Sequence, residues 1–541
     1  MSYQKKSAPG DAMRMTKRSL AYLSLLLAAT PALAQESAPE TIPLFDNLGA
    51  HTRTVTTSSP LAQRYFNQGL QLANAFGRSE AAQSFREAQR HDSNCAMCYW
   101  GEAWALGPYI NEAMDSTAGV QAYRAIQKAK ALAGANRNEQ ALIEAMATRY
   151  VPIPTADNRA RLDSIYADAM RDVVRRFPND LDAGALLGEA LMVLSPWNHW
   201  THEGQPQPGT EEALAVLESV LARDIKHPAA CHHYIHLVEG SPMPERAEAC
   251  ADHLAAAIPG ASHIQHMPSH IYMNIGRYGD GVRANQKAWQ VDQQAAHGQA
   301  VAIYPGHNLH MLIYAAWMDG QSAVALQAAS DLAKRSPRNA FYPVLLRVRF
   351  GRWDEVLAMN QVPEDPFHRG LWNFGLGMAH LRMEHSDSAR IHLDRLVSIA
   401  EATPDSLTYG FFEHRQADLL NMAGGILEGE FAAFGEHYDD AVHALTQAVS
   451  LEDNLVYAEP EPWPLPVRQF LGAVLLEANR PAEAEQVFRE ELEDHPRNGW
   501  SLYGLKQSLM AQGRHEEVAE VHARFEKAWA RADVWLQSSR F

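Results

Sequence analysis

Apolar residues recur along most of the chain with the three-to-four-residue spacing of amphipathic helices. Short turns built on Gly-Arg, Gly-Asp or Pro separate one apolar stretch from the next, and the alternation persists from about residue 61 to residue 529. No stretch shows a convincing two-residue alternation of the kind a β-strand would have. The pattern predicts an all-helical protein in which each helix buries one face against its neighbours.

The helical stretches carry an internal repeat of small residues and one large residue. A glycine is followed at offsets of 12 and 16 by an alanine and by a large apolar residue, and in two cases by a further alanine at 19. The turns Asn479-Arg480 and Gly513-Arg514 lie 34 residues apart. These are the offsets of tetratricopeptide (TPR) repeats, in which small residues let paired helices approach closely. We therefore expect an all-α, TPR-like right-handed superhelical solenoid of stacked antiparallel helix pairs. The offsets are counted from Gly69, Gly429 and Gly472.

Residues 1–34 have the pattern of a secretory signal peptide. Lys17 and Arg18 are followed by a short apolar run over residues 20–29, and Ala32-Leu33-Ala34 forms a small-x-small cleavage site. The run is too short to span a bilayer permanently. We expect a periplasmic or secreted protein with no membrane insertion after the signal is cleaved.

The rest of the chain divides by composition and repeat pattern. Residues 35–60 are rich in Ser, Thr and Pro and predict an extended lead-in. N-terminal TPR-like repeats follow over 61–200, central repeats with a histidine-lined groove over 201–330, and C-terminal TPR repeats over 331–541. Two segments, 204–210 and 459–466, are expected to be inserted loops.

Charge narrows the choice of partners. The 541 residues carry a formal charge of −17, with 46% hydrophobic residues that suffice for a large core. Residues 1–34 contribute +4 (five Lys and Arg against Asp11), so the mature chain is near −17 − 4 = −21. This charge argues against nucleic acid or an anionic membrane as a partner, and it favours cationic ligands, including metals.

Histidines gather at matching positions of successive predicted helices. His232, His266 and His310 each lie 15 residues before the small residue of the following helix, and His236 and His270 lie four residues further on. In a TPR solenoid such positions on the first helix of each pair line the concave groove. The spacing therefore predicts a ladder of imidazoles that face one another across adjacent helices.

Neutral imidazoles that converge within a few ångströms are natural ligands of transition metals. We expect copper, zinc or iron in the groove, without a choice among them. Glu239 or Glu189 would be an outer-shell group or a general base, and His233 is expected to be structural because it points elsewhere on its helix. Further groove residues are Tyr314, Glu102 and Asn308. The expected metal ligands are His232, His236, His263, His266, His270, His307 and His310.

Other interpretations remain open. The same groove could be a metal-free TPR scaffold that binds a peptide, a protein or a small ligand. Cys95 and Cys98 could be a redox pair or a local disulfide, and the four cysteines allow three complete pairings. The residues do not decide whether the protein is an enzyme, nor do they separate hydrolysis from oxidation. Tryptophans such as Trp197 are expected in the core or the groove wall.

Several segments resemble one group of bacterial exported TPR proteins. The similarity covers nearly the whole mature chain and is densest at three motifs: HHYIHLVE from His232, HMPSHIY from His266 and YPGHNLH from Tyr304. The resemblance implies an exported helical-repeat protein and no particular activity. One segment departs from the pattern of this group. Similar proteins often have Phe-Asn-His just before the second helix of the first pair, and this chain has Phe76-Gly77-Arg78 there.

Overall fold

The computed structural model describes residues 41–114, 116–132 and 134–541. Residues 42–541 pack into one unit. The predicted signal peptide and the beginning of the predicted lead-in lie outside the described residues, and residues 41–59 form neither helix nor strand. Across the described ranges, no helix is both long and apolar enough to cross a membrane.

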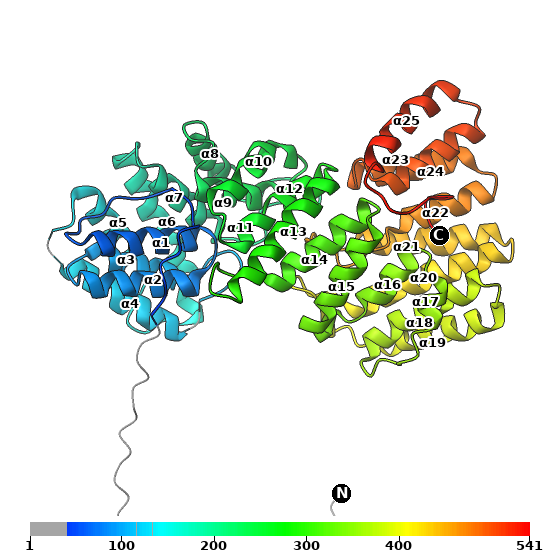
Figure 1. Ribbon diagram of the computed structural model, residues 1–541, viewed down its shortest axis with the longest axis horizontal. Coiled ribbons are helices and arrows are strands. Elements are labelled where there is room, and N and C mark those ends of the chain that lie inside the picture. Colours follow the sequence, from blue (N-terminus) through cyan, green and yellow to red (C-terminus); the bar gives the residue numbers. More distant parts are fainter. Residues whose placement is uncertain (1–40, 115, 133) are drawn as a thin grey trace, which may run out of the picture. The chain divides into compact units, whose positions relative to one another are not determined.

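Helices follow one another as stacked pairs through the described chain (Figure 1), which confirms the predicted all-α, TPR-like solenoid. The first group is α1 (Pro60–Asn74), α2 (Arg78–His91), α3 (Ala96–Ala105), α4 (Ser116–Ala131), α5 (Arg137–Ala147), α6 (Ala156–Arg176) and α7 (Leu181–Met192). The second group is α8 (Thr210–Leu221), α9 (Pro228–Val238), η1 (Pro244–Ala247), α10 (Glu248–Ala257), α11 (Ser262–His266), α12 (Pro268–Asn274), α13 (Tyr278–Ala295), α14 (Pro305–Met318) and α15 (Ser322–Arg335).

The third group is η2 (Pro337–Asn339), α16 (Tyr342–Arg349), α17 (Trp353–Leu357), α18 (Pro366–Arg382), α19 (Ser386–Ala402), α20 (Gln416–Phe434), α21 (Tyr438–Asp453), α22 (Val467–Glu477), α23 (Pro481–Asp494), α24 (Gly499–Ala511) and α25 (His515–Ala528). Between α19 and α20 lies a small antiparallel hairpin of β1 (Thr408–Tyr409) and β2 (His414–Arg415). The sequence pattern gave no sign of this hairpin because each strand has only two residues.

One backbone motif closes the turn inside many of the pairs. The second residue after the helix has a left-handed backbone. The N–H of the residue that follows it donates to the carbonyl oxygen five residues earlier, as Gln321 donates to Ala316 at 2.9 Å. This is the Schellman ending, which favours glycine because a side chain strains the left-handed backbone. The residues in the left-handed position are Phe76, Gly276, Gly320, Gly351, Glu384, Glu436, Asn479 and Gly513.

Close helix packing depends on glycines that face an aromatic ring. A Cβ added at Gly472 or Gly504 would lie 2.4 or 2.2 Å from the ring of Phe488, so this ring is held between two successive first-of-pair helices. The same arrangement recurs 403 residues earlier, where Phe85 lies against Gly69 and Gly101. The repeat offsets in the sequence thus correspond to one packing unit used at both ends of the solenoid.

Two buried apolar clusters make up the core. One runs from Ile42 to Ile303 and the other from Met273 to Leu536, so their sequence ranges overlap only around α12 to α14. The cysteines form the disulfides Cys95–Cys98 and Cys231–Cys250. Both sulfurs of the first pair are buried, which favours a structural role over exchange with other thiols.

We expect Phe488→Ala to destabilise the C-terminal repeats by about 3–5 kcal/mol, because it empties the space between two glycine-bearing helices. Thermal unfolding followed by circular dichroism would show a lower midpoint. Phe434→Ala, at an exposed position on α20, is the matched control and should leave the midpoint nearly unchanged. Equal midpoints for the two variants would contradict this account of the packing.

Candidate metal centre

Six histidines from three successive first-of-pair helices meet in the middle of the solenoid. They form two groups of three, in each of which the nitrogens lie within 4.8 Å of one another. We call them triad A and triad B. Triad A is His232, His236 and His263, and triad B is His266, His270 and His307.

The three helix positions of the ladder are α9, the broken helix α11–α12 and α14. Pro268 interrupts the middle helix after His266, yet His266 and His270 remain on one face, with ring centroids 4.7 Å apart. The triads touch each other, since the rings of His263 and His266 lie 5.2 Å apart and those of His236 and His270 lie 5.6 Å apart. The ladder predicted from register therefore brings these six side chains together.

Within each triad, two ring nitrogens face each other directly. Nε2 of His232 lies 3.1 Å from Nε2 of His263, and Nε2 of His266 lies 3.0 Å from Nε2 of His270. Two imidazole nitrogens bound to one tetrahedral metal ion, at about 2.05 Å each, would be roughly 3.3 Å apart. The observed spacings are close to that value.

Hydrogen bonds behind the rings fix where the ring protons lie. Nδ1 of His232 donates to the carbonyl oxygen of Asn74 at 2.6 Å, and a carbonyl can only accept. Nδ1 of His266 lies 3.1 Å from Oδ1 of Asn285, whose amide nitrogen donates to Gly281. Both rings therefore carry their proton on Nδ1, and each presents the lone pair of Nε2 to the centre.

Glu239 hydrogen-bonds to one histidine of triad A and forms an ion pair with one histidine of triad B. Its Oε1 lies 3.1 Å from Nδ1 of His236, and its Oε2 lies 2.7 Å from Nδ1 of His270. A second carboxylate, Glu459, also contacts Nδ1 of His270. Such carboxylate–histidine pairs orient metal ligands and make them more basic.

Burial determines the charge of the cluster. It holds the pKa of five histidines well below the ordinary value, and neighbouring histidines lower several of them further, so these rings are neutral. His270 differs: burial opposes its charge, but the carboxylates of Glu239 and Glu459 outweigh burial and raise its pKa to about 10. The five are His232, His236, His263, His266 and His307.

The arrangement calls for cations between the rings. Lone pairs 3.0 Å apart repel unless a proton or a metal ion lies between them, and His270 supplies at most one such proton. Nε2 of His236 and Nδ1 of His263 are buried without any hydrogen-bond partner. An ion in triad A would use the lone pair of Nε2 of His236, whereas Nδ1 of His263 belongs to a ring whose Nε2 already faces His232.

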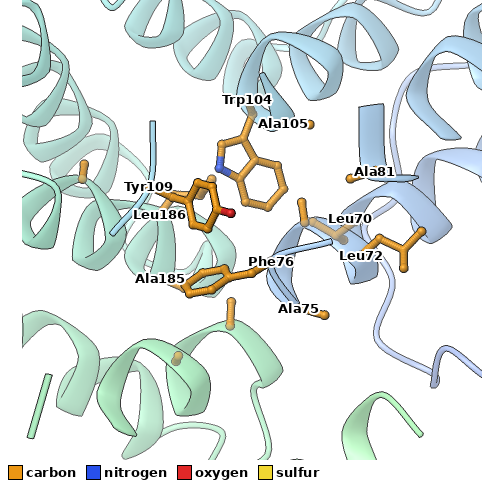
Figure 2. Close-up of a cluster of buried hydrophobic side chains, with 14 of the residues drawn as sticks. Leu70, Leu72, Ala75, Phe76, Ala81, Trp104, Ala105, Tyr109, Ala185 and Leu186 are labelled. Carbon is orange, nitrogen blue, oxygen red and sulfur yellow. The ribbon is translucent and has the colours of Figure 1, made fainter. Parts of the chain in front are cut away.

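Aromatic side chains in unusual backbone conformations surround the histidines. Phe76, Trp197 and Tyr304 have φ of 62°, 60° and 53°, in the left-handed region. The Phe76 ring lies 4.2 Å from the ring of His232, and Figure 2 shows it beside Tyr109 at the turn that ends α1. Left-handed backbone is strained for aromatic residues, and three such residues lie together beside the histidines.

A cavity of about 300 Å³ opens onto the two triads. Histidines of both triads line it, together with Glu239 and Glu459. The rest of its wall is Asn111, Trp197, Tyr304, Phe411, Phe412 and Tyr457. The sequence predicts that Trp197 lies in the core or in the groove wall, and Trp197 lines this cavity.

Several residues expected at the site lie elsewhere. His310 shares the ladder register, but its Nε2 contacts the hydroxyl of Tyr342 and it belongs to neither triad. Glu189 is paired with Arg78 and accepts a hydrogen bond from Trp104 at 2.8 Å, so it is a buried structural anion and does not line the cavity. Glu102 pairs with Arg86.

Asn308 and Tyr314 are also expected in the groove. Asn308 has a structural partner, and Tyr314 lies elsewhere. Asn308 donates to Asp292 at 3.0 Å, below the start of α14. Tyr314 lines a neighbouring, larger cavity and not the one over the triads. His233 lies on the far side of α9, near Glu189, as expected of a structural histidine.

The site also contains residues that the repeat pattern does not reveal. Glu459 and Tyr457 come from the loop between α21 and α22, and Phe411 and Phe412 come from the tip of the β1–β2 hairpin. These segments have no periodicity. The only hint was the prediction of an inserted loop over 459–466.

A third group, His51, Asp182 and His227, also has ligand-like spacing. Here Nδ1 of His227 accepts the N–H of Ala230 as the cap of α9, so its proton lies on Nε2 and points to Asp182 at 3.2 Å. Arg53 binds the same carboxylate at 3.1 Å. Every group is satisfied without a metal, and the cluster serves to fix the start of α9.

No protein-family model and no curated protein matches the chain. Among solved structures, the chain is similar to the APC/C hetero-tetramer Cut9–Hcn1, with 13% identity over 88% of this chain and 78% of that one, and a TM-score of 0.29. It is also similar to the human IFIT1 dimer with m7Gppp-AAAA, with 11% identity over 87% of this chain and 91% of that one, and a TM-score of 0.30.

Removing the charge of Arg78 tests whether Glu189 is a buried structural anion. Arg78→Met should lower the stability by about 3–5 kcal/mol because it leaves a buried carboxylate unpaired, and the double variant Arg78→Met/Glu189→Gln should recover part of the loss. Thermal melts of the wild type and the variants would measure both effects. A stable single variant would mean that Glu189 is free for another role.

Proposed function

We propose that this protein is exported to the periplasm and binds two transition-metal ions in its groove, one in each triad. One observation carries the proposal. Nδ1 of His232, His236 and His266 faces a fixed acceptor and burial keeps these rings neutral, so each has an Nε2 lone pair that an ion could use. Hydrogen bonds alone leave buried ring nitrogens unpartnered, whereas metal ions would use them.

The type of ligand atom narrows the choice of metal ion. Neutral imidazole nitrogens suit copper, zinc, iron and nickel, and disfavour magnesium and calcium, which prefer oxygen. Three nitrogens per ion leave an open position of the kind found in catalytic sites, facing the cavity. Glu239 would act as a positioning residue shared by the two ions, since it contacts His236 and His270 through different oxygens.

An acidic cavity beside the site offers a route for cations. It has a volume of about 920 Å³ and shares Glu239, Tyr457 and Glu459 with the cavity over the triads. Its wall also includes Glu452 and Asp494. Carboxylates outnumber the two arginines of this wall, Arg468 and Arg497. A cleft with an excess of negative charge concentrates cations, so this wall would attract metal ions toward the histidines.

The competing function is a metal-free scaffold whose groove binds a peptide or a small ligand. Helical-repeat solenoids commonly present such concave surfaces. This function requires neither stoichiometric metal nor any sensitivity to chelators, and that difference separates the two.

Elemental analysis by ICP-MS is the direct test. We expect the untagged protein, incubated in turn with copper(II), zinc and iron(II) and then desalted, to retain two equivalents of at least one metal. The variants His266→Ala/His270→Ala and His232→Ala/His263→Ala should each retain about one equivalent, because each removes one triad.

The control is His380→Ala/His385→Ala, a pair whose Nδ1 atoms lie 3.5 Å apart on a different turn. It should retain both equivalents. Absence of bound metal in the wild type after all three incubations would overturn the proposal and leave the scaffold function. If the wild type retained one equivalent of metal, and this equivalent were lost only when both triads were removed together, the triads would share a single ion.

The outer-shell carboxylates should tune affinity without being ligands. Glu459→Gln is expected to weaken metal binding about 10–100-fold, since it removes a charge that orients His270. Competition titration with a chromophoric chelator would measure this change. Glu245→Gln, at an exposed position of the same acidic cavity, should leave the affinity unchanged, and an equal loss in both variants would point to general electrostatics.

A further inference from the structure

We infer that the cavity over the two triads is a binding site for a neutral single-ring phenol, which would lie beside the open positions of the metal ions. The inference rests on the proposed function for the role of that ligand as a substrate. The binding itself depends on side chains of the cavity wall that contact no metal. Four features of the cavity lead to this ligand class.

The wall is aromatic on several sides. The Trp197 ring lies 5.7 Å from Phe412 and 6.2 Å from Phe411, in edge-to-face orientation, and 5.3 Å from His236. Tyr304 and Tyr457 add two more rings. Aromatic rings bind another ring through edge-to-face and offset contacts in preference to an aliphatic chain of equal size.

The volume fits one ring with small substituents. An apolar cavity of about 150 Å³ suffices for benzene, and this one measures about 300 Å³. One ring therefore fits, with room left for substituents. The histidines and carboxylates occupy one part of the wall, so the ring would lie against the aromatic part.

In the part of the wall without histidines and carboxylates, two buried polar atoms have no hydrogen-bond partner. They are Nε1 of Trp197, a donor, and Oδ1 of Asn111, an acceptor. A hydroxyl group both accepts and donates, so one phenolic hydroxyl could serve either atom. A cationic ring is disfavoured because the metal ions would repel it.

A second opening serves this part of the wall. A cavity of about 980 Å³ shares Asn111, Trp197, Phe411 and Phe412 with the smaller one. Phe411, at the tip of the β1–β2 hairpin, is 65% exposed. Apolar molecules would thus enter past the hairpin tip, whereas cations would enter through the acidic cavity.

Isothermal titration calorimetry on the protein, with and without bound metal, tests the inference. The probes are phenol, cyclohexanol of similar size, and benzylammonium. We expect phenol to bind with one site and about 10-fold tighter than either of the other two. Trp197→Ala and Phe411→Ala should each weaken phenol binding at least about 5-fold, with metal content by ICP-MS unchanged.

Trp535→Ala and Phe434→Ala, at exposed positions that line none of these cavities, are the matched controls and should bind phenol as the wild type does. Cyclohexanol binding as tightly as phenol, tighter binding of benzylammonium, or unaffected binding in Trp197→Ala and Phe411→Ala would overturn the inference. Metal content is measured on the same samples. Bound metal without phenol binding refutes the inference alone. Phenol binding by a protein that retains no metal after incubation with copper(II), zinc and iron(II) refutes the proposed function alone.

Discussion

The close stacking of successive first-of-pair helices is the constraint on which the rest of the structure depends. Beside the histidine helices a glycine permits this stacking, since a Cβ added at Gly281 of α13 would lie 3.2 Å from Cβ of Ala315 in α14 and 3.4 Å from Cγ of Met273 in α12. Helices this close place residues of equal register in contact across the groove. Because three successive helices carry histidine at such positions, the packing itself assembles two triads with ring centroids about 5 Å apart.

Burial turns this geometry into chemistry. A histidine in water is partly protonated near neutral pH, and clustered protonated rings would repel. In the groove, burial keeps five of the six neutral, and carbonyl, amide and carboxylate acceptors place protons on the outward nitrogens. Only His270, between two carboxylates, favours a charge. The result is a set of neutral rings with inward lone pairs beside one histidine that favours a charge.

Much of this was predictable from sequence, and the exceptions have physical reasons. The ladder follows from repeat register, because register fixes which side chains share a groove. His310 keeps the register, but the next first-of-pair helix offers Tyr342 as its partner in place of another histidine. Glu189 also has the groove register, but its carboxylate forms a buried ion pair with Arg78. Glu459 and Phe411 come from loops, where no periodicity relates sequence to position.

Phe76 shows how the fold accepts strain in order to shape the site. Its place in the turn after α1 is the one that Gly276 and Gly320 occupy in the two turns that follow α12 and α14. A left-handed aromatic residue costs roughly 1–2 kcal/mol relative to glycine. The phenyl ring in return lies against four histidine rings, at 4.2 to 5.9 Å. Its contacts add to the burial that keeps the rings of triad A neutral, so a strained turn in one repeat supports the histidines of another.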